Sequence, residues 1–156
     1  MAKEGANQVN IQFKSIGENA ALARLLVAAM VAKYDLTIAE LDEIKVAVSE
    51  AVSNAIIHGY ENKPNNMVEM SITVDDGLLS IVIKDYGVGI EDIDLAMQAN
   101  FSSDGDRMGL GFSFMQSFMD ELQVESTVGQ GTTVTMTKNI LADCDIKDYA
   151  VSNCNC

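Results

Sequence analysis

Hydrophobic residues alternate with polar ones near the start of the chain and then recur at helical spacing. The segment NQVNIQFK, Asn7–Lys14, has an apolar residue at every second position, which predicts a strand with one buried face. A helical spacing follows through Leu22, Leu25, Leu26, Ala29, Met30 and Lys33. Ser15 and Glu18 stand three residues apart before it, which predicts a capping box at the start of this helix.

A second helix is predicted from Thr37 onward. Thr37 and Glu40 repeat the capping signature. The apolar residues that follow share one helix face: Leu41, Ile44, Val48, Val52, Ala55 and Ile56. Gly59 is predicted as the C-terminal cap of this helix, because glycine readily adopts the left-handed conformation that ends helices.

The second half of the chain contains strand pairs with helical segments between them. The expected hairpins pair residues 68–74 with 78–83 and residues 122–127 with 132–138, with turns at Asp75-Asp76-Gly77 and 128–131. A short helix is expected over 91–99, and a longer one from near Gly109 through Met119. This order predicts an α+β sandwich, with a mixed, mostly antiparallel sheet covered by helices on one face.

The predicted domain covers residues 1–140, and residues 141–156 are expected to form an acidic tail. The chain has three cysteines, and all of them lie in that tail: Cys144, Cys154 and Cys156. They cannot crosslink the core, which is typical of a protein from a reducing compartment. With a single histidine in the chain, a structural zinc site is not expected.

The formal net charge of −13 narrows the classes of partner. The ten lysines and arginines are scattered, and a nucleic-acid phosphate backbone repels an acidic surface that has no basic patch. The longest apolar run, residues 25–32, is too short to span a bilayer, and MAKEGANQ lacks the apolar stretch of a signal peptide. We therefore expect a cytoplasmic protein that binds neither nucleic acid directly nor a membrane.

Glu50, Asn54 and His58 recur at four-residue intervals in SEAVSNAIIHGY, on the second predicted helix. Residues four apart lie one turn above another, so these three side chains are expected on one polar stripe. A surface helix always has a polar side, and the stripe has that simple interpretation. The other interpretation is that it forms the floor of a site.

Two glycine-containing segments carry further candidate chemistry. In DYGVGI, Asp85 follows a strand, and Gly87 and Gly89 permit close approaches that a β-carbon would block. The segment is either a tight turn or a site where the carboxylate accepts from an exocyclic amine beside a flat ring. In RMGLGFSFM, Gly109 and Gly111 stand at a helix start, whose N–H groups and positive dipole end suit phosphate oxygens.

These motifs, followed by a strand that opens Gly131-Thr132-Thr133, together resemble the GHKL ATPase superfamily of gyrase, histidine kinase catalytic domains and mismatch-repair ATPases. The matches are Glu50 and Asn54 to its N box, Asp85, Gly87 and Gly89 to its G1 box, and Gly109 and Gly111 to its G2 box. Within the superfamily, VSEAVSNAIIHGY and FMDELQVES resemble small anti-sigma factors that are also serine protein kinases, above all the sporulation branch. The resemblance covers about residues 10–140.

The resemblance implies a role for each matching residue in binding ATP or ADP. Asn54 would give an oxygen to Mg²⁺, which bridges the nucleotide phosphates, and Glu50 would be the general base. Asp85 would accept from the adenine amine, with Thr132 or Thr133 supporting it through a hydroxyl or a bound water. The glycines would lie against the nucleotide.

The resemblance also implies partners. Residues 99–108 match the position of the ATP lid, where Arg107 would meet phosphate charge or a partner. Arg24 matches an arginine that these anti-sigma factors place against their sigma factor, here one of the sigma F type; a solvated surface arginine is the simple alternative. The substrate would be a serine of an anti-anti-sigma factor. A homodimer is expected, with the strand Asn7–Lys14 contributing.

Three alternatives remain beside this interpretation. A histidine kinase catalytic domain is disfavoured, because the single histidine lies inside the N-box helix and no phosphoacceptor helix pair is seen before the domain. A binding-only anti-sigma factor would hold ATP as a structural clip, but a clip needs no base such as Glu50. The related kinase that controls a general-stress sigma factor stays open, although SEAVSNAIIHGY and DYGVGI favour the sporulation branch.

Overall fold

The structure is a computed structural model that describes residues 5–98 and 110–141. Its five strands form one sheet in the order β1-β2-β3-β5-β4, and each neighbouring pair is antiparallel. The strands are β1 (Asn7–Lys14), β2 (Met67–Asp75), β3 (Leu78–Asp85), β4 (Glu121–Thr127) and β5 (Gly131–Asn139). The predicted strands and hairpins are confirmed, and the described sheet is antiparallel throughout rather than mixed.

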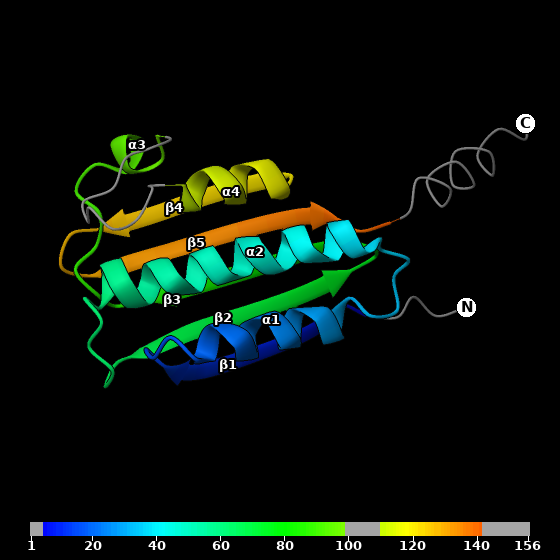
Figure 1. Cartoon of the computed structure of the whole chain (residues 1–156), viewed down its shortest axis with the longest axis horizontal. Coiled ribbons are helices and arrows are strands. Elements are labelled where there is room, and N and C mark those ends of the chain that lie inside the picture. The colour runs from blue at the N-terminus through cyan, green and yellow to red at the C-terminus, as the bar shows by residue number, and fades with distance from the viewer. Residues whose placement is uncertain (1–4, 99–109, 142–156) are drawn as a thin grey trace, which may run out of the picture.

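Helices cover one face of this sheet, as predicted for the α+β fold (Figure 1). They are α1 (Asn19–Met30), α2 (Ile38–Asn54), α3 (Ile93–Ala96) and α4 (Gly111–Phe118), and one π-helical turn, η1 (Ala55–Gly59), continues α2. The expected helix over 91–99 is only the single turn α3. None of the described helices is long and apolar enough to cross a lipid bilayer.

The core lies between the helices and the covered face of the sheet. Along β3 every second side chain points into it: Leu79, Ile81 and Ile83, each at most 1% exposed. Removing one such aliphatic side chain from water contributes about 1.5–3 kcal/mol to stability. Because strand residues alternate between faces, Asp85 continues this buried row and faces the helix layer.

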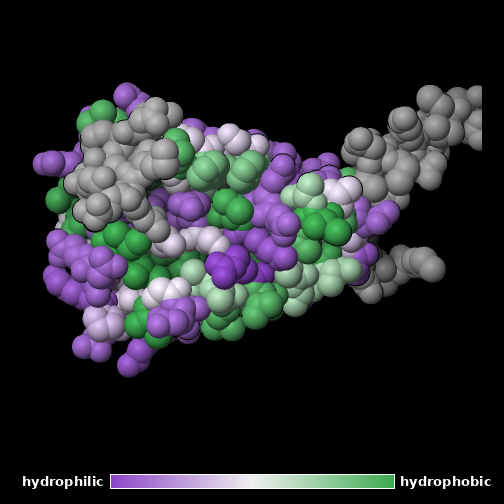
Figure 2. Space-filling model, viewed as in Figure 1, coloured by the Kyte–Doolittle hydropathy of each residue, from purple (hydrophilic) through white to green (hydrophobic). Residues whose placement is uncertain are grey.

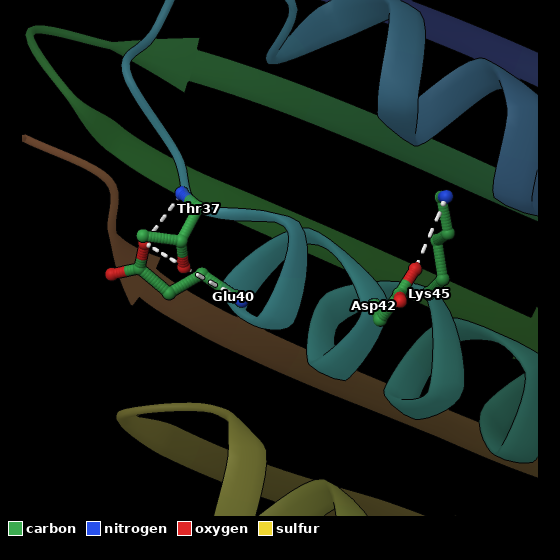
Figure 3. A network of polar contacts seen from close by, with 4 residues as sticks. All are labelled: Thr37, Glu40, Asp42 and Lys45. Carbon is green, nitrogen blue, oxygen red and sulfur yellow. Dashed lines mark hydrogen bonds and ion pairs between the residues drawn. The ribbon is translucent and has the colours of Figure 1, made fainter.

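The start of α2 has the predicted capping box (Figure 3). The Glu40 amide donates to Thr37 Oγ1 at 3.2 Å, and the Thr37 amide donates to Glu40 Oε2 at 2.7 Å. Figure 3 also shows the ion pair between Lys45 and Asp42, whose Nζ and Oδ1 atoms are 3.4 Å apart. Surface ion pairs of this kind contribute little to stability. The apolar face predicted for α2 is confirmed, since Ile44, Val48 and Val52 are fully buried.

The predicted helix is confirmed as α1, but its predicted cap was wrong. Ser15 does not cap the helix: it is buried, its hydroxyl donates to the Lys63 carbonyl at 2.6 Å, and the helix begins only at Asn19. The buried face of α1 consists of small side chains, namely Ala20, Ala23 and Val27. Leu22 and Leu25, whose spacing indicated the helix, are 47% and 69% exposed. The helix is apolar on almost every side, so its spacing alone does not select the packed face.

The β2–β3 hairpin closes through a two-residue turn, one residue shorter than predicted. Asp75 pairs with Leu78, and Asp76 and Gly77 both have left-handed backbone conformations, with φ of 48° and 79°. This is the conformation of a type I′ turn, which suits the twist of the flanking strands. The same turn contacts the residue that follows β5, because the Ile140 amide donates to the Gly77 carbonyl at 2.8 Å. The predicted boundary at residue 140 stays a prediction, because residues 142–156 lie outside the described residues.

Candidate functional site

The start of α4 lies directly against the polar stripe of α2. A β-carbon on Gly111 would lie 2.9 Å from Glu50 Oε2 and 3.4 Å from both side-chain atoms Nδ2 and Oδ1 of Asn54. Leu110, the N-cap residue, forms no side-chain cap for the first N–H groups of α4. The helix start therefore brings its positive end close to a carboxylate and a carboxamide. Arg107 and Gly109 of the predicted site lie outside the described residues.

Past Asn54 the helix widens, and the place of His58 on the stripe stays a prediction. From Ala55 to Gly59 the chain forms a π-helical turn, in which the Tyr60 amide donates to the Ala55 carbonyl at 2.9 Å. Single π-helical turns inside α-helices are frequent at functional sites.

Gly59 has a different role from the predicted one. The backbone of Gly59 is not left-handed. The residues with left-handed backbone conformations in this segment are Glu61 and Asn62, with φ of 54° and 60°. A β-carbon on Gly59 would lie 2.7 Å from Cγ and Oδ1 of Asp85. Gly59 is thus required so that the Asp85 carboxyl group can pack on the end of η1. The sequence reasoning missed this residue as part of the site.

Asp85 is buried, with 4% of its surface exposed. The Gly87 amide donates to its Oδ1 at 2.9 Å, and the Thr132 amide is its second backbone donor. Burial raises the pKa of Asp85 above its ordinary value of 3.8, and these two hydrogen bonds oppose the rise. Because the pKa of Asp85 is higher in the folded state than in the unfolded state, folding stability falls as the pH rises from 3.8 through the folded-state pKa. A further donor, such as an exocyclic amine, would offset the desolvation of the carboxylate.

The loop after Asp85 passes between η1 and the turn that joins β4 to β5. The Val88 amide donates to the Gly59 carbonyl at 2.9 Å, and the Val88 carbonyl accepts from the Gly129 amide at 2.8 Å. Gly89 is left-handed, with φ of 75°, and a β-carbon there would lie 2.4 Å from the Thr127 carbonyl oxygen. The backbone of this loop is therefore fixed on both sides, in line with the predicted need for close approach.

The structure separates the two threonines of the predicted site. Thr132 lies opposite Asp85 in the sheet and on the same, helix-covered face. Its hydroxyl is 2.8 Å from Ser126 Oγ, which also donates to the Gly131 carbonyl and accepts from the Ile90 amide. Thr133 lies on the uncovered face. Ser126 was not found from the sequence, and only its place beside the β4–β5 turn could have indicated it.

The Arg24 side chain reaches from α1 to α2, close to the end of the site that contains Glu50. Its Nη1 donates to Ser49 Oγ at 2.9 Å, and Ser49 directly precedes Glu50. Exposed apolar side chains stand along the same side of α1, and Figure 2 shows them as a hydrophobic area over this helix. Arg24 is half-buried and oriented by Ser49, so it is not a freely solvated arginine.

The candidate site has two ends, separated by the single π-helical turn η1. At one end Glu50 and Asn54 lie beside the start of α4, and at the other Asp85 lies between Gly59 and Gly87. The first end has the groups to meet an anion and a metal ion. The second has a desolvated acceptor among glycine backbone, which suits a flat ring that carries a donor.

Known proteins share this architecture. A family model described as a histidine kinase-like ATPase domain matches residues 13–138. Among solved structures, the RsbU and RsbW domains of a Mycobacterium tuberculosis protein align with a TM-score of 0.60 at 20% identity, covering 86% of this chain and 32% of that one. A histidine kinase domain from Erythrobacter litoralis aligns with a TM-score of 0.54 at 19% identity, covering 88% and 64%. At these identities the two structures show the fold alone.

Curated relatives are much more similar in sequence. The chain is 50% identical over 136 residues to the anti-sigma F factor of Geobacillus thermodenitrificans, covering 86% of this chain and 93% of the relative. It is 45% identical over 137 residues to the anti-sigma F factor of Priestia megaterium, again covering 86% and 93%. The chain therefore belongs to the family of anti-sigma F factors, and its residues 13–138 form a histidine kinase-like ATPase domain.

Proposed function

We propose that the chain is an anti-sigma factor and a protein serine kinase: it binds a sigma factor of the sigma F type and, with Mg-ATP, phosphorylates a serine of its anti-anti-sigma antagonist. The observation that carries this proposal is the packing of Gly111 against Glu50 and Asn54. It places a carboxylate and a carboxamide oxygen side by side at the start of a helix, where phosphate groups are favoured. The relatives named anti-sigma F factors support the partners.

In the proposed complex, Asn54 would hold Mg²⁺ through its side-chain oxygen, and Asp85 would accept from the adenine amine. ATP supplies the phosphoryl group and Mg²⁺ offsets its charge. Glu50, one turn before Asn54, takes the proton of the substrate serine. The serine oxygen forms its bond to the γ-phosphorus, the bond from that phosphorus to the β–γ bridging oxygen breaks, and ADP leaves. Gly87, Gly89, Gly109, Gly111 and Arg107 complete the proposed nucleotide site.

The exposed apolar side of α1 supports the proposed sigma-factor surface. Its residues are Ala21, Leu22, Leu25 and Ala29, with Arg24 at its border. An exposed apolar patch is a candidate surface for binding another protein, and arginine is among the residues enriched at interface hot spots. We assign this surface to the sigma factor, because an acidic chain has few other positive groups to place against a partner.

We also propose a homodimer to which β1 contributes. β1 is an edge strand of the described sheet, and one side of its backbone has no neighbouring strand there. An uncovered edge is a template for pairing with another chain. Pairing through this edge would cover it.

Asn54→Ala is expected to abolish the magnesium-dependent part of ATP and ADP binding. The substitution removes the single oxygen proposed for the metal and leaves Asp85 and the loop glycines in place. Isothermal titration with ATP, with magnesium and then with a chelator, measures the effect. Asn65→Ala, in an exposed loop position, is the matched control. Equal magnesium-dependent affinity in Asn54→Ala and wild type would remove Asn54 from the metal site.

Leu25→Glu, which places a charge in the apolar patch, and Arg24→Ala, which removes the arginine at its border, are each expected to weaken sigma-factor binding by about tenfold or more, the effect of losing a hot-spot residue. A pull-down with purified sigma F at graded concentrations measures this. Ile38→Glu is the control, since Ile38 is 82% exposed at the start of α2, away from the patch. Unchanged capture by both variants would place the sigma-factor surface elsewhere.

A separate sedimentation experiment on the wild-type chain is expected to show two subunits.

A further inference from the structure

Tyr60 holds the loop of the candidate base pocket through its hydroxyl group. It directly follows η1 and is only 6% exposed. Its hydroxyl donates to the Met67 carbonyl at 2.6 Å and accepts from the Tyr86 amide at 2.8 Å. Burial raises the pKa of Tyr60, so the hydroxyl keeps the proton that it donates to Met67. One buried hydroxyl therefore joins the start of β2 to the residue that follows Asp85.

Tyr60 acts together with Gly59, its neighbour in the chain. The Gly59 carbonyl accepts from the Val88 amide at 2.9 Å, two residues after the Tyr86 amide held by Tyr60. Between these two anchors lies Gly87, whose own amide donates to Asp85 Oδ1 at 2.9 Å. Two amides of this loop, those of Tyr86 and Val88, are thus held by Tyr60 and Gly59, and the Gly87 amide between them donates to Asp85. The position of the Asp85 carboxylate depends on them.

The contacts of Tyr86 show that the anchor acts on the backbone. The Tyr86 side chain points to the other face of the sheet, where its hydroxyl donates to Glu69 Oε2 at 3.1 Å and its ring lies 4.7 Å from the Lys84 ammonium group. It is 53% exposed. The aromatic ring of Tyr60 could fill its place in the core without an oxygen. The hydroxyl is the part that reaches the loop.

We propose that Tyr60 is a positioning residue that sets the choice of base. Through the backbone amide of Tyr86, its hydroxyl keeps the Asp85 carboxylate where it accepts from the exocyclic amine of adenine. Guanine has a carbonyl oxygen in the corresponding place, and the carboxylate would meet this second acceptor instead. The inference rests on the proposed nucleotide function of this site. Adenine gains a hydrogen bond to the carboxylate, whereas guanine sets two acceptors against each other. This difference requires Asp85 to stay in place within a few tenths of an ångström, since hydrogen bonds weaken steeply with distance and angle.

The test is Tyr60→Phe, which keeps the ring and removes the hydroxyl. We expect the ratio of GDP to ADP dissociation constants to fall roughly tenfold, which corresponds to about 1.4 kcal/mol. Tyr34→Phe removes the same atom from a tyrosine in the segment between α1 and α2, and is expected to leave the ratio unchanged. A role in stability alone would weaken both nucleotides equally and keep the ratio. An unchanged ratio in a folded Tyr60→Phe protein overturns the proposal.

Amide hydrogen exchange of the wild-type chain tests the anchor if Tyr60→Phe does not fold. The Tyr86 and Val88 amides are expected to exchange as slowly as those inside β3, and rapid exchange at Tyr86 overturns the proposal. This measurement needs no nucleotide. If wild type binds neither ADP nor GDP while both amides are protected, the proposed nucleotide function fails and the anchor stands. Binding of both nucleotides with equal affinity by wild type overturns the base-selection role.

Discussion

Glu50→Gln is expected to lower the rate of phosphoryl transfer to the substrate serine by about 10²–10⁴-fold, the usual contribution of a general base. A serine hydroxyl is a poor nucleophile at neutral pH, and glutamine has almost the shape of glutamate but cannot take the proton. The packing of Gly111 against this side chain would be kept, because the amide fills the same space. Binding of Mg-ATP and of the sigma factor should stay close to wild type, since Asn54, Asp85 and the α1 surface are unchanged.

Labelled-phosphate transfer to the anti-anti-sigma protein at saturating ATP measures this effect, with a sigma-factor pull-down run beside it. Glu43→Gln is the matched control. Glu43 lies on the same helix seven residues earlier, which is about two turns and so on the same side of α2. Its transfer rate is expected to equal that of wild type. If Glu50→Gln transfers phosphate within a few-fold of wild type, Glu50 is not the base and the polar stripe of α2 has no catalytic role.

Gly87→Ala is expected to lower the free energy of unfolding by about 1–3 kcal/mol, as overpacking a well-packed site does, and to weaken adenine nucleotide binding at least tenfold. The new β-carbon would lie 1.9 Å from the Gly59 carbonyl oxygen and 2.3 Å from its carbon. Both are backbone atoms, so neither can rotate away. The loop must move off η1, which breaks the hydrogen bond from Val88 to Gly59 and displaces the amide that donates to Asp85.

Denaturant unfolding and calorimetry with ADP measure the two effects of Gly87→Ala. Gly17→Ala is the control, because a β-carbon on Gly17 meets nothing within 4 Å and its backbone is not left-handed. It is expected to bind ADP as wild type does, with unchanged or slightly higher stability. Wild-type unfolding and ADP affinity in Gly87→Ala would show that the loop is not held against η1 in solution.

Features set by neighbouring residues could be predicted from the sequence. The capping box of Thr37 and Glu40 needs only four consecutive residues, and both hairpins follow from strand alternation and turn residues. Strand alternation also distinguishes Thr132 from Thr133, because only Thr132 lies on the same face as the buried residues Val134 and Met136. That choice could have been made from the sequence.

Features set by distant contacts could not be predicted. The cap expected at Ser15 is lost because its hydroxyl finds the carbonyl of Lys63, far along the chain. Position 59 needs a glycine because the carboxyl group of Asp85 packs against it. The packed face of α1 depends on which side of the helix lets it approach α2 most closely. In the candidate site, the types of residue were readable from motifs. The roles of Gly59, Tyr60 and Ser126 depend on the folded loop, which no local pattern reveals.

The π-helical turn affects how many residues can separate the two ends of the candidate site. A π turn closes its hydrogen bonds over five residues where an α turn uses four, so η1 is equivalent to a one-residue insertion at the end of α2. Deleting one residue of η1 is expected to restore a regular α-helix, which covers almost the same rotation and rise with one residue fewer. Gly59 would then still face Asp85 and Val88. A related chain with one residue fewer between Asn54 and Gly59 is therefore expected to keep the two ends of the site in place with an ordinary helical turn.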